Sequence, residues 1–143
     1  VLSFGYKEAV MGAKILVVDD DPEILEAIGI ILEANGYEVI TARDGIEGLN
    51  KLREEKPDLM ILDLLMPKMD GFEVCKELKD PRWAKYAHIP IVILSSVRQD
   101  ASRRRYELET GLQLDVDDYV EKPIEHIVLL ERIGKILKKV GKA

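Results

Sequence analysis

Residues 57–71 read Pro-Asp-Leu-Met-Ile-Leu-Asp-Leu-Leu-Met-Pro-Lys-Met-Asp-Gly, and this segment gives the clearest indication of the fold. Its apolar run ends at Leu62. A Pro-Asp pair before the run and proline and Asp-Gly turn formers after it predict a short buried strand. Asp63 stands at the carboxyl end of that strand, where open parallel sheets place their functional groups. A single carboxylate there is most often a turn cap, so other strand ends must show whether Asp63 belongs to a site.

A strand followed by a helix recurs five times along the chain. Continuous apolar runs such as Ile15-Leu16-Val17-Val18 predict strands that are covered on both faces. Apolar residues at helical spacing, between starts such as Asp21-Pro22 and stops such as Asn35-Gly36, predict the helices. We therefore expect an α/β fold in which a five-stranded parallel sheet has helices on both faces. The expected strands are residues 15–18, 37–41, 60–62, 91–94 and 118–120.

Two of the expected helices make specific predictions about the core. In the helix expected over residues 44–55, the spacing turns Ile46, Leu49 and Leu52 inward. In the helix expected over residues 124–140, the packed set is Ile127, Leu130, Ile133, Ile136 and Leu137. Two further helices are expected over residues 71–78 and 98–110, the second one highly charged.

Composition excludes several classes of function. The 143 residues fit one domain, expected over 11–143, with residues 1–10 as an extension or vector-derived segment. The net charge of -6 argues against a nucleic-acid-binding surface, which needs clustered Lys and Arg. One cysteine, Cys75, excludes an internal disulfide, and two histidines disfavour a histidine metal site. No apolar stretch approaches the roughly 20 residues of a membrane span, and we expect a cytoplasmic protein that binds no membrane.

Polar side chains follow four of the five expected strands. Crossovers between parallel strands are right-handed almost without exception, so the carboxyl ends of these strands share one edge. Asp21 is assigned to the cap of the following helix instead. The residues expected together on the shared edge are Asp19, Asp20, Asp63, Ser95 and Lys122.

The chemistry of this set is that of phosphoryl transfer onto a carboxylate. Three carboxylates repel one another, which raises at least one pKa, unless a hard cation such as Mg²⁺ binds and leaves room for phosphate oxygens. Lys122 offers a counter-charge and Ser95 a hydroxyl donor, although singly they could be an exposed ion pair and a helix cap. An Asp can attack phosphorus, and positioning with charge neutralisation then does most of the catalysis.

With these residues in place, the chain resembles the response-regulator receiver domains of two-component systems. The matching pieces are Ile15 to Asp20, Asp63 to Gly71, Ile91 to Ser95, and Tyr119 with Lys122-Pro123. The resemblance implies a flavodoxin-like (βα)5 fold with strand order 2-1-3-4-5. It also implies a phosphorelay signalling domain that takes a phosphoryl group from a histidine kinase or histidine phosphotransfer protein and then changes how it binds an output partner. Such a domain is no enzyme beyond its own phosphotransfer and autodephosphorylation, and phosphorylation-dependent homodimer formation stays open.

The resemblance implies a role for each carboxylate. Asp63 would be the phosphoacceptor. Asp20 and Asp63 would bind Mg²⁺ directly, with Mn²⁺ as a substitute, and Asp19 would act mainly through water. The backbone carbonyl of Leu65 would complete the protein ligands.

The resemblance also implies a set of phosphoryl contacts and a switch. Lys122 would hold a phosphoryl oxygen, and the backbone of Leu64 and Ser96 would bind the phosphoryl group. Ser95 would be the switch hydroxyl, and Tyr119 the aromatic that turns inward behind it. The alternative for Tyr119 is a core aromatic whose hydroxyl reaches the surface. The Lys122–Pro123 peptide bond would be cis.

Two other functions remain open at this point. A Mg²⁺-dependent phosphohydrolase also uses an Asp nucleophile, but that class usually needs a second acid two residues later, where this chain has Leu65. A pseudo-receiver would act through protein contacts without phosphorylation, and the complete polar set at the strand ends argues against it.

The chain departs from the common receiver pattern in two places. Residues 96–118 form a longer segment than in compact receivers, with the extra length near 109–116, which puts family rules on dimer geometry in doubt. Leu65 and Val97 are expected to flank the acceptor with apolar side chains. We hypothesise that they hinder the hydrolytic water and give a long-lived aspartyl phosphate.

Overall fold

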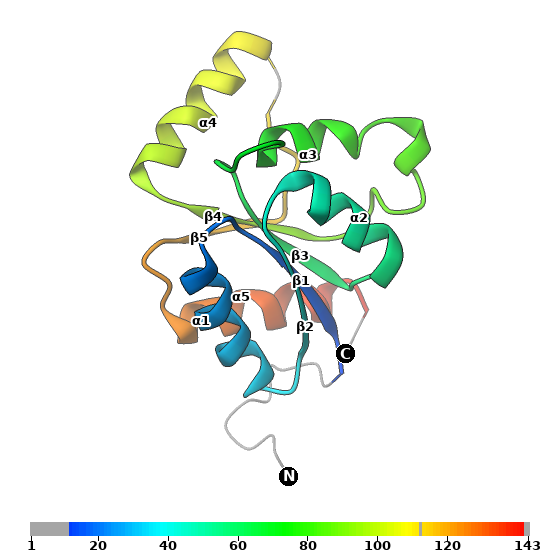
Figure 1. Ribbon diagram of the computed structural model, residues 1–143, viewed down its shortest axis with the longest axis vertical. Coiled ribbons are helices and arrows are strands. Elements are labelled where there is room, and N and C mark those ends of the chain that lie inside the picture. The colour runs from blue at the N-terminus through cyan, green and yellow to red at the C-terminus, as the bar shows by residue number, and fades with distance from the viewer. Residues whose placement is uncertain (1–11, 112, 142–143) are drawn as a thin grey trace.

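The computed structural model describes residues 12–111 and 113–141, except the side chains of Val97 and Arg98. Strands and helices alternate along the chain, and the short 3₁₀ helix η1 (Pro81–Trp83) precedes the fourth strand (Figure 1). The strands are β1 (Lys14–Val18), β2 (Glu38–Ala42), β3 (Leu59–Asp63), β4 (Ile91–Ser95) and β5 (Asp118–Glu121). The α-helices are α1 (Pro22–Glu33), α2 (Gly45–Glu55), α3 (Gly71–Glu77), α4 (Val97–Thr110) and α5 (His126–Lys139).

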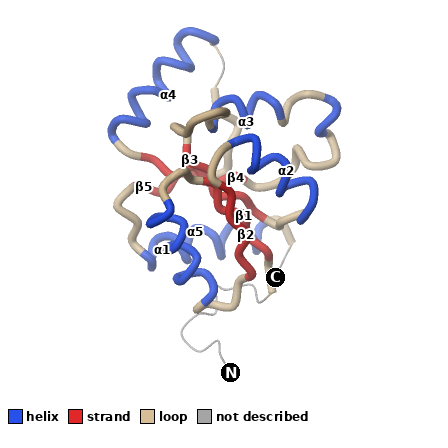
Figure 2. Tube along the Cα trace, in the orientation of Figure 1, coloured by secondary structure: helices blue, strands red, loops and turns tan. Residues whose placement is uncertain are grey.

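The strands form one sheet in the order β2-β1-β3-β4-β5, and every neighbouring pair is parallel (Figure 2). The fold class and strand order expected from the sequence are therefore confirmed. The register places Val18 opposite Leu62 and Asp63 opposite Leu94. The carboxyl ends of β1, β3 and β4 consequently lie at the same edge of the sheet.

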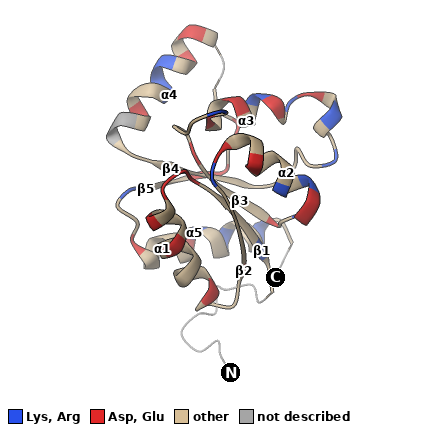
Figure 3. Ribbon diagram, in the orientation of Figure 1, with Lys and Arg blue, Asp and Glu red and all other residues tan. Residues whose placement is uncertain are grey.

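Each face of the sheet has its own hydrophobic core. On one face, α1 and α5 pack against alternate residues of the strands, such as Ile15, Val17 and Ile61. On the other face, α2 and α3 pack against the intervening residues, such as Leu16, Val18 and Leu62. Because side chains alternate along a strand, apolar residues at consecutive positions fill both cores at once. Charged residues lie on the helices and are sparse within the strands (Figure 3).

The predictions that Ile46 and Ile127 face the core are wrong, since they are 49% and 68% exposed. The buried side of α2 is formed by Leu49, Leu52 and two glycines, and Ile46 lies about 100° around the helix from it. Ile127 lies similarly far from the buried side of α5, which begins at Leu129. Both residues are apolar at the first turn of an amphipathic helix, where the apolar face is easily misjudged by one position.

Helix α4 extends away from the rest of the fold at the top of the view (Figure 1). The ring of Tyr106 stacks on that of Phe72 of α3, with centroids 4.8 Å apart. Gly111 ends α4 with a left-handed φ of 71°, as its place in the sequence predicts. Residues 109–110 therefore belong to the end of α4, and the described residues 113–116 are irregular. Among the described residues, none of the helices has the length and apolar character that a membrane span needs.

Candidate functional site

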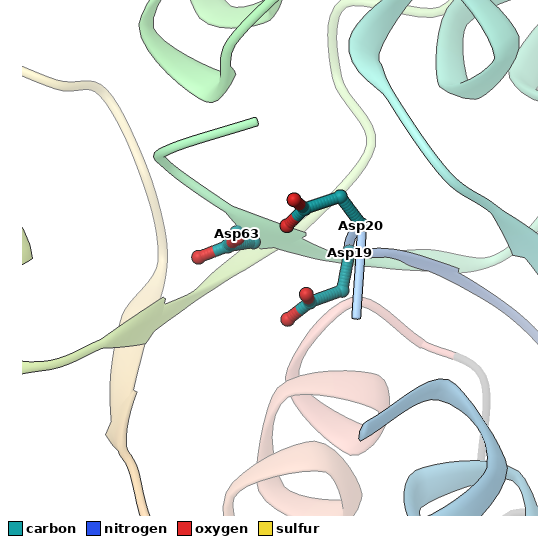
Figure 4. A group of neighbouring side chains, drawn as sticks. All are labelled: Asp19, Asp20 and Asp63. Carbon is teal, nitrogen blue, oxygen red and sulfur yellow. The ribbon is translucent and has the colours of Figure 1, made fainter. Parts of the chain in front are cut away.

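Three carboxylates meet at the carboxyl ends of β1 and β3 (Figure 4). Asp63 is the last residue of β3, and Asp19 directly follows β1, the neighbouring strand. With Asp20 they each offer an oxygen within 4.8 Å of the others. Asp19 and Asp63 are buried, whereas Asp20 is exposed. The cluster is thus enclosed by protein on the strand side and open to solvent at Asp20.

Local hydrogen bonds hold the β1–α1 connection in place. Asp19 Oδ1 accepts from the backbone N–H of Asp21 at 2.9 Å. Asp21 Oδ1 in turn accepts from the backbone N–H of Glu23 and caps α1, which confirms the capping assignment. Asp19 is therefore oriented toward the cluster, while Asp21 serves the helix.

The loop from β3 to α3 is held by two close backbone approaches. The N–H of Gly71 donates to the carbonyl of Leu64 at 2.9 Å, and that of Gly45 donates to the carbonyl of Met69 at 2.8 Å. A Cβ on Gly71 would lie 2.5 Å from the carbonyl oxygen of Asp63, so only glycine fits there. Asp70 and Glu73 form a reciprocal capping box at the start of α3. These contacts fix the backbone that follows Asp63.

Lys122 brings a positive charge to the carboxylates from the end of β5. Its Nζ lies 3.2 Å from Asp19 Oδ2 and 3.3 Å from Asp63 Oδ1. Its backbone N–H donates to the carbonyl of Ser95 at 2.7 Å, which joins β5 to β4 at this point. The Lys122–Pro123 peptide bond is cis.

Burial and the neighbouring charges shift the pKa values of the acids and of Lys122. Burial raises the pKa of the Asp63 carboxyl to about 6, and the neighbouring charge of Asp19 adds to the rise. Burial likewise raises the pKa of Asp19. Burial alone would lower the pKa of the Lys122 ammonium, but the charges of Asp63 and Asp19 leave it raised. Within the part of the chain that the structure describes, Lys122 is the one cation paired with the two buried acids, so the site favours a further positive charge.

The residues present fit a hard divalent cation. All three cluster residues offer carboxylate oxygens, the donors that Mg²⁺ prefers, and Asp20 leaves an open side for water. Asp19 Oδ2 is buried without a hydrogen-bond partner among the described residues, with Lys122 as its charged neighbour. Such an oxygen is available as a ligand or as an acceptor from metal-bound water.

Helix α4 adds contacts to the site that the sequence did not indicate. The side-chain amide of Gln99 donates from Nε2 to Asp63 Oδ1. The hydroxyl of Ser95 donates to Asp100 Oδ1 at 2.6 Å. The guanidinium of Arg103 lies over the half-buried ring of Tyr119. The one signal that could have identified Gln99 is its place on the first turn after the cap residue Ser96, directly behind a strand end.

A cavity of about 500 Å³ lies on the β5 side of this region. Ser95, Tyr119 and Lys122 line it, together with Asp100 and Arg103. Space is therefore present beside the hydroxyl of Ser95 and the ring of Tyr119.

Leu64 is buried and Leu65 is half-buried after Asp63, whereas the prediction for Val97 concerns a side chain outside the described residues.

Residues 15–134 match the family model of the response regulator receiver domain. The chain belongs to this family. Receiver domains are signalling domains of two-component systems, they switch on phosphorylation, and they bind Mg²⁺ at an acidic pocket. This receiver domain has a cluster of three acids, Asp19, Asp20 and Asp63, that could hold a metal ion. Residues 1–10, expected as an extension, lie outside the described residues.

Relatives of this receiver domain include regulators and single domains. It is 41% identical to the alkaline phosphatase synthesis transcriptional regulatory protein PhoP of Bacillus subtilis, over 90% of this chain and 50% of PhoP. A structure of chemotaxis protein CheY4 of Vibrio cholerae matches with a TM-score of 0.74 and 30% identity, covering 88% of this chain and 99% of CheY4. The receiver domain of a signal transduction histidine kinase from Syntrophus aciditrophicus matches with a TM-score of 0.73 and 32% identity, covering 92% and 95%. The chain spans about half the length of the curated relatives that it matches.

Proposed function

We propose that this receiver domain stores a signal as a phosphoryl group on Asp63. The observation that carries the proposal is the position of Asp63, buried at the end of β3 between two acids and Lys122. Its proposed donor is the phosphohistidine of a histidine kinase or of a histidine phosphotransfer protein in the cytoplasm. The proposed result is a changed surface that binds an output protein or domain differently.

The transfer step is a direct displacement at phosphorus. An oxygen of the Asp63 carboxylate forms a bond to phosphorus while the bond from phosphorus to the donor's imidazole nitrogen breaks. The electron pair of the broken bond stays on that nitrogen, and the histidine returns to its neutral form. In hydrolysis, a water oxygen forms a bond to phosphorus while the bond from phosphorus to the Asp63 oxygen breaks. The electron pair of the broken bond stays on the carboxylate, and the water loses a proton to solvent as inorganic phosphate leaves.

Mg²⁺, or Mn²⁺ in its place, would neutralise the phosphoryl oxygens as the charge builds on them. Asp20 and Asp63 are the proposed direct ligands, with the backbone carbonyl of Leu65, and Asp19 acts mainly through water. Burial raises the pKa of Asp63, and the neighbouring charge of Asp19 adds to the rise. Both effects support this assignment because a divalent ion would offset them.

The remaining site residues bind the phosphoryl group and report its presence. Lys122 is proposed to hold a phosphoryl oxygen, since its ammonium already lies at the carboxylates. Backbone groups of Leu64 and Ser96 are proposed as further contacts. Ser95 is proposed to turn its hydroxyl toward the phosphoryl group and Tyr119 to move inward, into the space that lies beside both residues.

Partners beyond the phosphodonor follow from charge and from the relatives. PhoP of B. subtilis is a transcriptional regulatory protein of which the match covers only 50%, and we propose that an output partner or domain responds to this receiver as well. The net charge of -6 supports a domain that does not itself bind nucleic acid. A homodimer formed on phosphorylation is proposed as one form of the switch.

The test is phosphorylation by phosphoramidate with Mg²⁺, followed by intact-mass and peptide mass spectrometry. We expect one phosphoryl group, located on Asp63, which is lost in Asp63→Asn and when EDTA replaces Mg²⁺. Asp115→Asn, an exposed acid in the loop before β5, is the matched control and is expected to label normally. If the unaltered protein gains no phosphoryl group, it acts as a phosphorylation-independent interaction domain instead.

A further inference from the structure

The side-chain amide of Gln99 is hydrogen-bonded to the Asp63 carboxylate, and packing alone does not explain why an amide stands at this position. Its side chain is buried, with 5% exposed, and its Nε2 donates to Asp63 Oδ1. Its Oε1 is also buried and has no hydrogen-bond partner among the described residues. A buried acceptor without a partner costs stability, which an apolar side chain of the same size would not. The amide is therefore better explained by its contact with Asp63 than by the stability of the fold.

The neighbouring residue makes an equivalent contact with the proposed switch hydroxyl. Ser95 donates its one hydroxyl proton to Asp100 Oδ1 at 2.6 Å. While that hydrogen bond exists, the hydroxyl of Ser95 cannot donate to a phosphoryl oxygen. Gln99 and Asp100 are adjacent on the first turn of α4, so one helical turn holds both the acceptor and the switch residue.

We propose that the first turn of α4 is a lock on the unphosphorylated site, in which Gln99 and Asp100 hold Asp63 and Ser95 away from their phosphorylated arrangement. The lock rests on the proposed function, because it acts on the phosphoryl transfer to Asp63. It adds two residues to the reaction: Gln99 as a competing donor on the acceptor, and Asp100 as a positioning residue that acts through Ser95.

Whether the hydrogen bond from Gln99 slows or accelerates phosphorylation depends on where negative charge lies during the reaction. Asp63 Oδ1 takes hydrogen bonds from both Lys122 and Gln99 in the unphosphorylated site. The hydrogen bond from Gln99 stabilises the carboxylate before reaction, but charge leaves the carboxylate as its oxygen bonds to phosphorus. An interaction that is stronger in the ground state than in the transition state slows the reaction. Loss of the Gln99 amide is therefore expected to accelerate phosphorylation.

The decisive experiment compares initial rates of phosphorylation by phosphoramidate at fixed Mg²⁺. We expect Gln99→Ala and Gln99→Met each to raise the rate about tenfold, the effect of losing one charge-assisted hydrogen bond. Gln99→Met keeps the volume of the side chain, so it guards against collapse of the site in the alanine variant. Gln113→Ala, an exposed glutamine in the loop after α4, is the matched control and is expected to react at the normal rate.

Variants of Asp100 provide a second test, and a purely structural role of Asp100 would not produce the expected results. Asp100→Ala is expected to free Ser95 and raise the phosphorylated fraction at steady state severalfold. Asp100→Asn keeps an oxygen acceptor for the hydroxyl and is expected to restore that fraction toward normal. Circular dichroism melting curves of each variant establish that the fold is retained.

The outcomes separate the lock from the function on which it rests. If Gln99→Ala and Gln99→Met are labelled on Asp63 at the same initial rate as the unaltered protein, the lock is overturned and the phosphoacceptor role still stands. Slower labelling of Gln99→Met also overturns it, since Gln99 would then assist the transfer as a donor. If Asp63 is labelled in none of the proteins, the phosphoacceptor role fails and the lock fails with it.

Discussion

The guanidinium of Arg103 lies over the ring of Tyr119, with its carbon 4.5 Å from the ring centroid. A terminal nitrogen of the same guanidinium lies 3.8 Å from Asp100 Oδ1, the atom that accepts from Ser95. A continuous line of side chains thus connects the hydroxyl at the end of β4 with the aromatic ring in β5. The position of Tyr119 is therefore physically tied to the hydrogen bond of Ser95.

Arg103→Ala is expected to release Tyr119 in the unphosphorylated protein. A cation–π contact at a partly exposed site contributes about 0.5–2 kcal/mol, which is enough to change the population of ring positions severalfold. Aromatic carbon NMR, with Tyr119→Phe to assign the signal, measures the shift in ring environment. Arg104→Ala, an exposed neighbour on the same helix, is the control. An unchanged Tyr119 signal in Arg103→Ala would show that other packing holds the ring.

Leu65→Asn is expected to shorten the lifetime of the phosphoryl group. The half-buried Leu65 offers an apolar surface two residues after Asp63, the proposed acceptor, where an amide could hold the attacking water. One such hydrogen bond corresponds to about a tenfold change in rate. The measurement is the loss of label after removal of phosphoramidate. Identical decay curves for Leu65→Asn and the unaltered protein, both fast, would contradict a role for this residue.

Without metal, Asp63 is expected to destabilise the protein at neutral pH. Its folded-state pKa of about 6 exceeds its ordinary value of 3.8, mainly because of burial. Between these values the folded state binds more protons than the unfolded state, so stability falls as the pH rises. The penalty is absent below about pH 4 and complete above about pH 6, with an upper size of about 3 kcal/mol.

Asp63→Asn removes that charge and is expected to be more stable than the unaltered protein at pH 7.5 in EDTA. The difference is expected to shrink as the pH falls to about 4.5, because the Asp63 carboxyl then takes up its proton. Urea unfolding followed by circular dichroism at several pH values measures it. Asp115→Asn is the control for removing a charge at an exposed position. A stability difference that is independent of pH would mean that Asp63 titrates normally.

The strand ends could be predicted because topology alone brings them together. In a parallel sheet with right-handed crossovers, residues that follow the strands must share one edge, and Asp19, Asp63 and Lys122 do. The apolar runs predict β1, β3 and β4 well because these strands are buried along nearly their whole length.

The contacts of α4 could not be predicted in the same way. This helix has few apolar residues to fix its orientation, so sequence periodicity does not tell which of its side chains face the site. Gln99 and Arg103 reach Asp63 and Tyr119 through tertiary packing between elements that are distant in the chain. The misplacement of Ile46 has a related cause, since a glycine-rich helix face leaves the apolar pattern short of markers.

Gly71→Ala is expected to displace Asp63, because Gly71 packs directly against the backbone of Asp63 and Leu64. An added Cβ would lie 2.5 Å from the carbonyl oxygen of Asp63 and 2.9 Å from the Cα of Leu64. Neither atom can move aside like a flexible side chain, so the loop after β3 must shift. We expect a loss of about 1–3 kcal/mol in the free energy of unfolding, together with slower phosphorylation of Asp63.

Gly29→Ala is the matched control, since it lies within α1 and, apart from the adjacent residues and the backbone of the helix itself, no atom lies within 4 Å of the added Cβ. Alanine there removes the entropic cost of a helical glycine, so we expect a gain of about 0.5–1 kcal/mol and unchanged phosphorylation. Urea unfolding and the rate of labelling by phosphoramidate, measured on both variants, separate the two effects. If Gly71→Ala were as stable and as reactive as Gly29→Ala, the loop after β3 would have to tolerate displacement, and the close approach of Gly71 would not position Asp63.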